Sequence, residues 1–590
     1  MRFSGARVLI ESLIENGVDT IFGYPGGSVL HIYDELSKYK DRIRHILVSH
    51  EQHAAHAADG YARSTGRVGV CLATSGPGAT NLVTGIATAF VDSVPIVAIT
   101  GNVSIPLLGK DSFQEVDITG ITMPIVKHNW IVEDVNELAL IVREAFVVAL
   151  SGRPGPVLID IPKDISSAFC EYHSAVSSEE LAIRNAQLAI RNKQNSGLVL
   201  NERALRLIGK TKRETFNDDD IERAAALINA SKRPMIYAGG GVVNSGATEE
   251  IKMMAEFIKA PVALSLMGMG AFPCGHPLCT GLIGMHGTVA SNKAVQKADL
   301  LIALGARFSD RVTSSVERFA PNARIIHIDI DPAEINKNIS AEVFIVGDLK
   351  AVLNRLIKKT HAKKNTEWND EINKWNAKAP NKRHGKNTLQ PCFVIQETAK
   401  ALGEKTIVVT DVGQHQIWAA QFYPFKNPRT FLSSGGMGTM GYGMGASIGA
   451  KIANPSAPVA LFTGDGSFRM DQGEMATMVK YGLPILIIIF NNSSLGMLRQ
   501  WQNFFYSANY YETALDNQGP DFIKLAEAYD VTAFRVINES LFIDALKKCV
   551  DILADGKPAL IEVIIDKDEK VIPMVPGGRP IDEQIMKGNQ

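Results

Sequence analysis

The chain has 590 residues, a length that predicts three or four domains at about 150 residues each. Its 61 Lys and Arg nearly balance its 62 Asp and Glu, giving a formal net charge of −1. This balance supplies no electrostatic reason to expect nucleic-acid binding. The best apolar run, residues 483–490, has the length of a strand and is far short of the ~18 residues of a membrane span, so we expect no membrane insertion.

The first residues, MRFSGARVLIESLIENGV, carry Glu11 and Glu15 within an apolar pattern. This pattern is typical of an amphipathic helix rather than of a signal peptide. The 6 cysteines include no C-x-x-C pair, so we expect neither a disulfide framework nor a zinc ribbon. We therefore expect a reducing compartment, which is the cytoplasm or, as an alternative, an organelle stroma.

Short β-branched runs alternate with longer helical patterns along the chain. The expected strands are, in chain order, GVCLATS, VPIVAITG, PVLIDIP, PMIYAGGG, DLLIALGARF, RIIHIDID, TIVVTDVG, PVALFTGDG, PILIIIFNN and ALIEVIID. Continuous apolar runs separated by helices are typical of buried parallel strands. The sequence therefore predicts an α/β fold of three doubly wound parallel-sheet domains.

Two charged, polar stretches divide the chain between these groups of strands. We expect an N-terminal domain at residues 1–176, a central domain at 218–358 and a C-terminal domain at 387–590. Linkers are expected at residues 177–217 and 359–386, and the composition of both is typical of a solvated surface rather than of a binding site.

The segment at residues 464–492 carries the clearest chemistry. It begins at the end of one expected strand with GDG and finishes at the end of the next with NN. Adjacent parallel strands would bring the oxygen donors of Asp465 and Asn492 side by side, and Mg²⁺ prefers such hard ligands. Gly464 and Gly466 would let the backbone approach a diphosphate closely. A lone GDG would indicate only a routine turn, but the second strand end argues against that interpretation.

This segment resembles the diphosphate–Mg²⁺ motif of thiamine diphosphate (ThDP) enzymes. The resemblance implies that Asp465 and Asn492 bind Mg²⁺ through their side chains and that Ser494 binds it through its main-chain carbonyl. It also implies that Glu51, in SHEQHAAHAADGYAR, protonates N1′ of the aminopyrimidine and so activates the cofactor. On its own, Glu51 would be interpreted as a helix-start carboxylate.

The three histidines next to Glu51 raise the question of a metal site. His50, His53 and His56 are spaced i, i+3, i+6, without a second cluster of metal ligands nearby in the sequence. We therefore favour helix and channel packing over zinc binding for these residues.

From GVDTIFGYPGG to VIPMVPGGRPID, the chain resembles the FAD-containing catalytic large subunit of acetohydroxyacid synthases (acetolactate synthases). The motifs are GYPGG, TSGPGATN, DSFQE, RPGPVLIDIPKD, DVGQHQ, SSGGMGTMGYG and LGMLRQW. The implied catalytic residues are Glu51, Gln114 and Lys163, and the implied substrate residues are Phe113, Arg311 and Trp501. The implied ThDP-binding residues are Gly27, Glu51, Val412, Gly413, Gln414, His415, Gly438, Met440, Gly464, Asp465, Gly466, Ser467, Asn492 and Met497.

The central part of the chain carries a separate signal. Glycine runs and acidic residues at successive strand ends suit a dinucleotide, although no G-x-G-x-x-G is present and NAD is weakly supported. The resemblance implies FAD in a structural role. The implied FAD-binding residues are Gly239, Gly240, Gly241, Met285, His286, Gly305, Arg307, Asp329 and Asp348.

The resemblance implies a transferase of branched-chain amino-acid biosynthesis. Pyruvate would be decarboxylated on ThDP, and its hydroxyethyl unit joined to pyruvate or 2-oxobutyrate, giving 2-acetolactate or 2-aceto-2-hydroxybutyrate. The alternative is another ThDP enzyme of the same fold, such as pyruvate oxidase or an FAD-free catabolic acetolactate synthase. An oxidoreductase with decayed ThDP motifs and a non-catalytic regulatory protein are the other rivals, and both conflict with the intact Glu51, Asp465 and Asn492.

The family resemblance also implies partners. Glu51 and Asp465 would come from different subunits at one cofactor, so a homodimer is the expected minimum, a tetramer is an alternative, and a small regulatory subunit is expected. One departure is Ser104 in GNVS, where family members often have proline; this places inhibitor response, rather than activity, in doubt.

Overall fold

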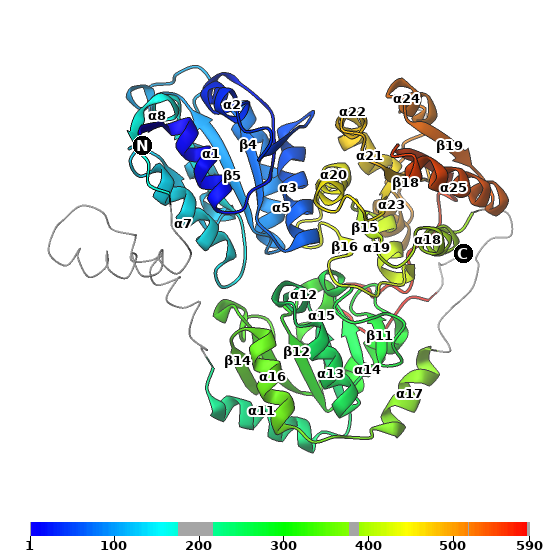
Figure 1. The fold of residues 1–590 in the computed structure, drawn as a ribbon. Coiled ribbons are helices and arrows are strands. Elements are labelled where there is room, and N and C mark those ends of the chain that lie inside the picture. Colours follow the sequence, from blue (N-terminus) through cyan, green and yellow to red (C-terminus); the bar gives the residue numbers. More distant parts are fainter. Residues whose placement is uncertain (1, 175–215, 377–388, 517–518, 587–590) are drawn as a thin grey trace. The chain divides into compact units, whose positions relative to one another are not determined.

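A computed structural model describes residues 2–174, 216–376, 389–516 and 519–586 (Figure 1). The expected linker at 177–217 therefore lies outside the described residues except for its last two, and the linker at 359–386 is described only to residue 376. The chain divides into two compact units, residues 1–213 with 448–453, and residues 214–447 with 454–590. Each unit is described by itself below.

The described residues contain three six-stranded parallel sheets, which confirms the predicted fold class. The first has the order β3 (Arg44–Leu47), β2 (Thr20–Gly23), β4 (Gly69–Ala73), β5 (Ile96–Asn102), β7 (Val157–Pro162), β6 (His128–Ile131). The second has the order β11 (Cys279–Leu282), β10 (Val262–Leu264), β9 (Pro234–Ala238), β12 (Leu300–Leu304), β13 (Arg324–Asp329), β14 (Val343–Val346). The third has the order β16 (Phe431–Leu432), β15 (Ile407–Thr410), β17 (Val459–Gly464), β18 (Ile485–Asn491), β20 (Ala559–Ile564), β19 (Thr532–Val536).

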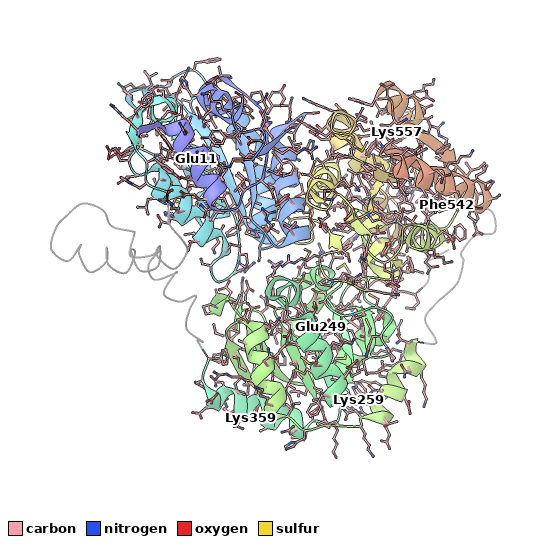
Figure 2. All side chains as sticks on the ribbon, in the orientation of Figure 1. Glu11, Glu249, Lys259, Lys359, Phe542 and Lys557 are labelled. Carbon is pink, nitrogen blue, oxygen red and sulfur yellow. The ribbon has the colours of Figure 1, made fainter. Side chains whose placement is uncertain are left out.

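Helices cover both faces of the first sheet, with α1 and α7 on one side and α3 and α5 on the other (Figure 1). The predicted N-terminal helix is α1, which begins after the cap Ser4 and keeps Glu11 at its surface, where Tyr39 donates to it at 2.7 Å (Figure 2). The helical segments of this unit are α1 (Gly5–Glu15), η1 (Gly27–Val29), α2 (Leu30–Leu36), α3 (Glu51–Thr65), α4 (Pro77–Asn81), α5 (Val83–Val91), η2 (Ile105–Leu107), α6 (Ile118–Thr122), η3 (Met123–Ile125), α7 (Leu138–Leu150) and α8 (Lys163–Ser167). A short antiparallel pair, β1 (Arg2–Ser4) with β8 (Phe169–Glu171), lies beside them.

The second sheet shows why its strands carry continuous apolar runs. Successive side chains of a strand point to opposite faces, so a sheet with helices on both faces must be apolar at every position. Along β12, Ile302 and Leu304 join the core beneath α11, α13 and α16, whereas Leu301 and Ala303 join the core beneath α14 and α17. The helical segments here are α11 (Asp218–Ala230), α12 (Gly240–Ser245), α13 (Thr248–Ile258), η4 (Leu266–Gly268), α14 (Val289–Lys297), α15 (Asp310–Thr313), η5 (Val316–Arg318), η6 (Pro332–Glu334), α16 (Leu349–Lys359) and α17 (Thr366–Asn376).

The third sheet has the same construction. Phe542 of α25 is fully buried and lies 6.2 Å from the ring of Phe393 of α18, so these two helices share one core (Figure 2). The helical segments are α18 (Pro391–Leu402), α19 (Gln414–Phe422), α20 (Gly443–Ala453), α21 (Asp465–Asp471), η7 (Gln472–Glu474), α22 (Met475–Lys480), α23 (Gly496–Phe505), α24 (Phe522–Ala528) and α25 (Glu539–Ala554). Among the helices of the described residues, none is both long enough and apolar enough to cross a bilayer.

Candidate active site

The carboxyl edge of the N-terminal sheet gathers three of the segments singled out in the sequence. Residues 24–29 follow β2, residues 48–51 follow β3, and residues 74–81 follow β4. The hydroxyl of Ser28 lies 2.9 Å from that of Thr74, and the amide of Ser75 donates to Ser28 Oγ at 2.9 Å. The GYPGG and TSGPGATN loops are thus held together by buried hydrogen bonds, with Gly27 at the start of η1.

Glu51 is the first residue of α3, directly after the N-cap His50, whose Nδ1 accepts the amide of Gln52 at 3.1 Å. The Oε2 atom of Glu51 accepts a hydrogen bond from Asn81 Nδ2 at 2.9 Å. Its Oε1 faces Gly78 of the same helix, α4, where an added Cβ would stand 3.3 Å away. Asn81 and Gly78 therefore fix the orientation of the Glu51 carboxyl. Neither residue was predicted to have this role, although both lie in the TSGPGATN motif.

The other predicted catalytic residues of this unit also lie at the carboxyl ends of its strands. Gln114 has a φ of 60° and packs on Gly76, where an added Cβ would stand 2.9 Å from Gln114 Cβ. Lys163 is the first residue of α8, immediately after β7, and is exposed. Phe113 is 88% exposed within the chain, so packing in the core of its own unit does not explain this large apolar residue.

The three histidines of α3 lie along one helix, with ring centroids 5.7 Å apart for His50 and His53 and 6.3 Å for His53 and His56. His56 is fully buried, and burial, followed by the neighbouring His53 and Arg63, holds its pKa well below the usual range. His56 is therefore neutral at pH 7. In the ranges that the structure describes, no group of three or more His, Cys, Asp or Glu side chains is arranged to hold a metal ion.

In the C-terminal sheet, β17 and β18 are parallel neighbours in which Gly464 pairs with Phe490. Asp465 follows directly after β17 and Asn492 directly after β18, so their side chains leave the sheet at the same edge. Both are buried, with exposures of 3% and 7%. The structure thus brings together the two residues that the sequence proposed as Mg²⁺ ligands.

The hydrogen-bonding capacity of the buried Asp465 carboxyl is only partly satisfied. Burial raises its pKa to about 7, against the opposing effects of Arg469 and of the backbone amides of Gly466 and Ser494 that donate to it. Its Oδ2 has no hydrogen-bond partner in the described structure. On the turn after β18, Asn492 Oδ1 accepts from the amide of Ser494 at 3.2 Å. A buried carboxylate with an unsatisfied oxygen beside an amide carbonyl is a donor set that suits Mg²⁺, so the residues present fit the expected ion.

The turn after β17 leaves room for a ligand because two of its residues are glycines. An added Cβ on Gly464 would stand 3.0 Å from His415 Nδ1, and one on Gly466 would stand 2.8 Å from Leu495 and 3.8 Å from the methyl group of Met440. Burial lowers the pKa of His415 to about 3, so the ring is neutral, and its Nε2 has no partner in the described structure. The ring donates to the backbone of Asp411, which leaves Nε2 as an acceptor, so the room for a diphosphate comes from the two glycines.

Gln414, at the start of α19, links this edge to α23. Its Oε1 accepts from Asn492 Nδ2 at 3.3 Å, and its Nε2 donates to Gln500 Oε1 at 3.0 Å and to the carbonyl of Glu569 at 2.8 Å. Gln500 is 3% exposed and, together with Gly496, was not predicted. The available signal was their i, i+4 spacing in LGMLRQW, which puts both on the face of α23 that meets Gln414.

Gly496 is the tightest position of this network. An added Cβ would stand 2.1 Å from Gln414 Oε1 and 2.5 Å from Asn492 Nδ2. We expect Gly496→Ala to displace both amides, to cost about 1–3 kcal/mol of stability as overpacking does, and to weaken ThDP binding in the presence of Mg²⁺. Calorimetric titration of ThDP with and without Mg²⁺ measures this. Gly275→Ala is the matched control because its Cβ would meet nothing within 4 Å. Equal titrations for the two variants would contradict the expectation.

The remaining predicted ThDP residues lie around the same edge. Val412 and Gly413 precede α19, and the carbonyl of Val412 accepts from Ser467 Oγ at 2.9 Å. Gly438 has a φ of 70°, a conformation that favours glycine. Met497 packs against the core of the unit, and Trp501 is half-buried with its ring 5.2 Å from that of Phe505.

The predicted dinucleotide residues all lie at the carboxyl edge of the central sheet. Gly239 and Gly241 pack directly on Gly305, where added Cβ atoms would stand 2.1 Å from its carbonyl oxygen and 2.6 Å from its Cα. This close contact between the loops after β9 and β12 accounts for those two glycines, whereas a Cβ added on Gly240 would stand 3.2 Å from Met267 Cβ. Asp329 ends β13, and Asp348 caps α16 by accepting the amide of Ala351 at 2.9 Å.

The loops after β11 and β12 meet at Met285. Its amide donates to the carbonyl of Arg311 at 2.8 Å, and Arg311 Nη1 lies 3.7 Å from its sulfur. Next to it, burial lowers the pKa of His286 to about 4, and His286 Nδ1 lies 3.2 Å from the carbonyl oxygen of Pro573. The side chain of Arg311 is 65% exposed. Arg307 is half-buried, and its carbonyl accepts from Asn338 Nδ2 at 3.1 Å.

Comparison with known proteins gives matches to three family models. The N-terminal TPP binding domain of thiamine pyrophosphate enzymes matches residues 3–121, the central domain matches 221–356, and the C-terminal TPP binding domain matches 411–563. The residues around Glu51 and those around Asp465 and Asn492 both fall within matched TPP-binding domains.

Individual relatives are similar over almost the whole chain. The acetolactate synthase large subunit of Corynebacterium glutamicum is 46% identical over 98% of this chain and 89% of its own length. A probable acetolactate synthase large subunit of Methanocaldococcus jannaschii is 46% identical over 98% of this chain and 94% of its own. The acetolactate synthase large subunit of Cyanidium caldarium is 46% identical over 98% of this chain and 95% of its own length. The chain is therefore a thiamine diphosphate-dependent enzyme and belongs to the family of acetolactate synthase large subunits.

Proposed function

We propose that this chain decarboxylates pyruvate and joins the remaining two-carbon unit to a second 2-oxoacid. With pyruvate as acceptor the product is 2-acetolactate, and with 2-oxobutyrate it is 2-aceto-2-hydroxybutyrate, which makes the chain a transferase of branched-chain amino-acid biosynthesis. The observation that carries the proposal is the 46% identity to acetolactate synthase large subunits over 98% of the chain.

Bound ThDP supplies a carbon nucleophile for the carbonyl group of the donor 2-oxoacid. The role of Glu51 is to hold a proton at its carboxyl, next to the pyrimidine ring of the cofactor. The hydrogen bond from Asn81 supports this role because it fixes one carboxyl oxygen and leaves the other facing Gly78. Gln114 and Lys163, which follow β5 and β7 on the same edge, would contact the reacting 2-oxoacids.

Asp465, Asn492 and the main-chain carbonyl of Ser494 would hold Mg²⁺. The ion would neutralise the charge of the diphosphate and take no part in the carbon chemistry. The unsatisfied Oδ2 of Asp465 supports this assignment.

FAD is the third proposed cofactor, at the carboxyl edge of the central sheet. Main-chain amides at the start of α12 and α16 suit a pyrophosphate, and Asp329 suits a ribose hydroxyl. The proposed FAD residues are Gly239, Gly240, Gly241, Met285, His286, Gly305, Arg307, Asp329 and Asp348. The absorption spectrum of the purified protein tests this assignment, since bound flavin is yellow.

Incubation with pyruvate, ThDP and Mg²⁺ tests the proposed reaction. We expect acetolactate as the main product, without acetyl phosphate or hydrogen peroxide. Acetyl phosphate or peroxide would favour a pyruvate oxidase instead, and acetaldehyde alone would favour a simple decarboxylase.

Trp501 is proposed to set acceptor choice because its half-buried ring offers an apolar face for the extra methyl group of 2-oxobutyrate. Arg311 would hold the carboxylate that both acceptors share. One methylene is worth about 1–3 kcal/mol in an apolar pocket, or about 10–200-fold in selectivity. We therefore expect Trp501→Leu to move the product ratio towards parity when both acceptors compete, with acetolactate still formed. If both products fall together with an unchanged ratio and a lower melting temperature, Trp501 is a packing residue.

We further propose a homodimer as the smallest active form, with a tetramer and a small regulatory subunit as larger assemblies, and the cytoplasm as the compartment. The names of the relatives support a subunit organisation, since they describe large subunits. Light scattering of the purified chain measures the oligomeric state.

A further inference from the structure

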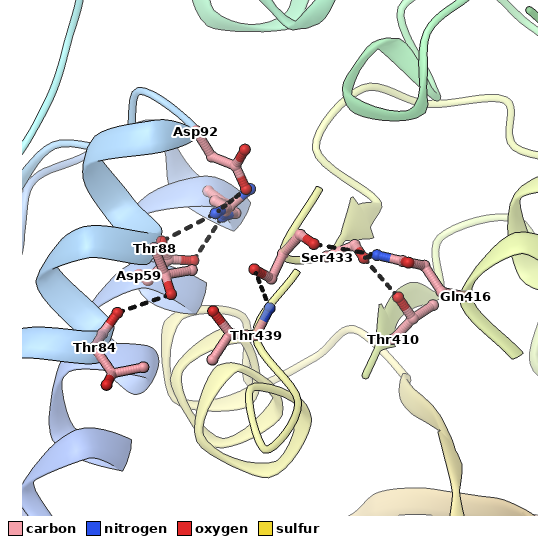
Figure 3. Close-up of polar contacts among 10 residues, drawn as sticks. Asp59, Thr84, Thr88, Asp92, Thr410, Gln416, Ser433 and Thr439 are labelled. Atoms are coloured by element: carbon pink, nitrogen blue, oxygen red, sulfur yellow. Dashed lines mark hydrogen bonds and ion pairs between the residues drawn. The ribbon is translucent and has the colours of Figure 1, made fainter. Parts of the chain in front are cut away.

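The segment of residues 433–444, called the glycine-rich segment below, carries two of the proposed ThDP residues, Gly438 and Met440. Its beginning is held by a polar network on α19 and β15 (Figure 3). Ser433 Oγ lies 2.7 Å from both Thr410 Oγ1 and Gln416 Nε2, and Gln416 Nε2 also lies 3.2 Å from the carbonyl oxygen of Ser434. Within the segment, the amide of Thr439 donates to Ser434 Oγ at 3.0 Å. These bonds fix the first part of the segment.

The end of the glycine-rich segment is held by two carboxyl groups. Asp411 Oδ1 accepts from the amide of Gly441 at 2.9 Å and from that of Val412 at 3.0 Å, and its Oδ2 accepts from the amide of Gly443 at 3.3 Å. Asp471, at the end of α21, accepts from the amide of Met444 at 2.9 Å through Oδ2. Three amides at the end of the segment thus depend on two carboxyls that lie 60 positions apart in the chain.

The two carboxyls lie within hydrogen-bonding reach of each other, and their exposures are 0% for Asp411 and 1% for Asp471. Two buried carboxylates in contact repel each other. They can lie this close only when one of them holds a proton and donates it in a hydrogen bond to the other. Burial and then the charge of Asp411 hold the pKa of Asp471 well above its usual range, and Glu474 adds to the same effect.

The position of the proton follows from the hydrogen bonds. Asp411 accepts from three amides through both of its oxygens, which stabilises its ionised form. Asp471 Oδ1 receives no hydrogen bond from a described N–H or O–H donor. We therefore assign the shared proton to this oxygen. An ionised Asp411 also lies next to Gly443, the first residue of α20, where the helix dipole favours a negative charge.

We propose that Asp411 and Asp471 are positioning residues that share one proton, with Asp411 ionised and Asp471 protonated, and that this pair fixes the end of the glycine-rich segment. Through that segment the pair places Met440, whose methyl group stands 3.8 Å from the position of a Cβ on Gly466. The consequence for ThDP rests on the proposed function, because Met440 and Gly466 are proposed cofactor residues. The proton-sharing pair itself does not rest on it.

Asparagine substitution distinguishes the two carboxyls. An asparagine amide can donate to a carboxylate and still accept from an amide, so Asp471→Asn reproduces the protonated acid. Asp411→Asn removes the charge and replaces one acceptor oxygen with a donor that faces backbone amides. We expect Asp471→Asn to keep ThDP affinity within about threefold of wild type, and Asp471→Ala to lower it by about 10-fold to 100-fold, as expected when a buried donor loses its acceptor. Asp411→Asn is expected to be the most damaging of the three.

Three measurements test the pair, and the first does not depend on the reaction. Infrared difference spectroscopy of the protein without ThDP, wild type minus Asp471→Asn, should show at pH 7 one C=O stretch of a protonated carboxylic acid, because bands from other protonated carboxyls such as Asp465 are common to both proteins and cancel. Titration of ThDP then gives the affinities of the three variants, and steady-state kinetics should show that Asp471→Ala changes the KM for ThDP more than the KM for pyruvate. Asp544→Asn, the same substitution at an exposed position of α25, is the control.

Absence of this acid band from the difference spectrum would overturn the proposal. Equal ThDP affinities for Asp471→Asn and Asp471→Ala would do so as well. If wild type shows the band but forms no acetolactate, the pair stands and the proposed function fails, so the two failures are separable. If Asp411→Asn does not fold, the comparison of the two Asp471 variants still decides the outcome.

Discussion

Replacing Glu51 with glutamine is expected to lower turnover by about 10²–10⁴-fold, the usual effect of removing a general acid or base. Glutamine keeps the shape of the side chain and can still pair with Asn81, but its amide cannot carry the proton. Because the contact at 2.9 Å to Asn81 remains possible and glutamine has the same size as glutamate beside Gly78, the cofactor should still bind. The informative measurement is the exchange of the C2 proton of bound ThDP, followed by NMR after quenching.

Glu539→Gln is the matched control for this variant. Glu539 is likewise the first residue of a helix, α25, and follows a capping residue, Asn538. A general effect of removing a negative charge from a helix start would lower the activity of both variants to a similar degree. A near-normal rate of C2 exchange in Glu51→Gln would rule out the proton-holding role of Glu51.

The second large effect is expected at Asp465. Asp465→Ala removes a buried carboxylate whose Oδ2 lacks any partner in the described structure, and with it the strongest proposed ligand of Mg²⁺. We expect ThDP affinity to fall by at least about 10–100-fold. Mutation of a residue that only supports a metal ligand already has an effect of this size, and Asp465 is a proposed ligand itself. The residual affinity should no longer depend on Mg²⁺, because the uncharged Asn492 and the carbonyl of Ser494 cannot hold the ion without the carboxylate.

Titrations of ThDP in Mg²⁺ and in chelator measure this dependence directly. Asp544→Ala, at an exposed position of α25, serves as the control for the loss of an acidic side chain. If Asp465→Ala kept the difference between Mg²⁺ and chelator that wild type shows, the assignment of Asp465 as a metal ligand would be wrong.

The sequence predicted the interior of each sheet and missed its edges. All ten predicted strands occupy inner positions, where helices cover both faces and the apolar run is continuous. The six edge strands were not predicted, because an edge strand such as β6 (HNWI) or β19 (TAFRV) keeps polar residues and is only half-buried. Two inner strands, β2 (TIFG) and β10 (VAL), were also missed, because such short runs carry fewer of the β-branched residues that mark the equally short β15 (IVVT).

The candidate site shows a similar division. Asp465 and Asn492 could be predicted because a parallel sheet brings the ends of its strands to one edge. Glu51 follows β3, an edge strand that was not predicted, and its role came from the family resemblance. The residues that orient the site could not be predicted, because their partners are remote in the chain. Asn81 reaches Glu51 across 30 positions and Gln500 reaches Gln414 across 86. The i, i+4 spacing of Gly496 and Gln500 places both on one face of a helix, but it does not identify Gln414 as the residue that this face meets.

The central claim is that this chain forms a carbon–carbon bond between two 2-oxoacids with the help of ThDP, and product analysis tests it most directly. Purified protein would be incubated with isotopically labelled pyruvate, Mg²⁺ and ThDP, and the products followed by NMR. The account predicts that 2-acetolactate accumulates with one CO₂ released for every two pyruvates consumed, and that omission of ThDP abolishes it. Consumption of pyruvate with one CO₂ for every pyruvate, or acetolactate formation that is independent of ThDP, would contradict the account.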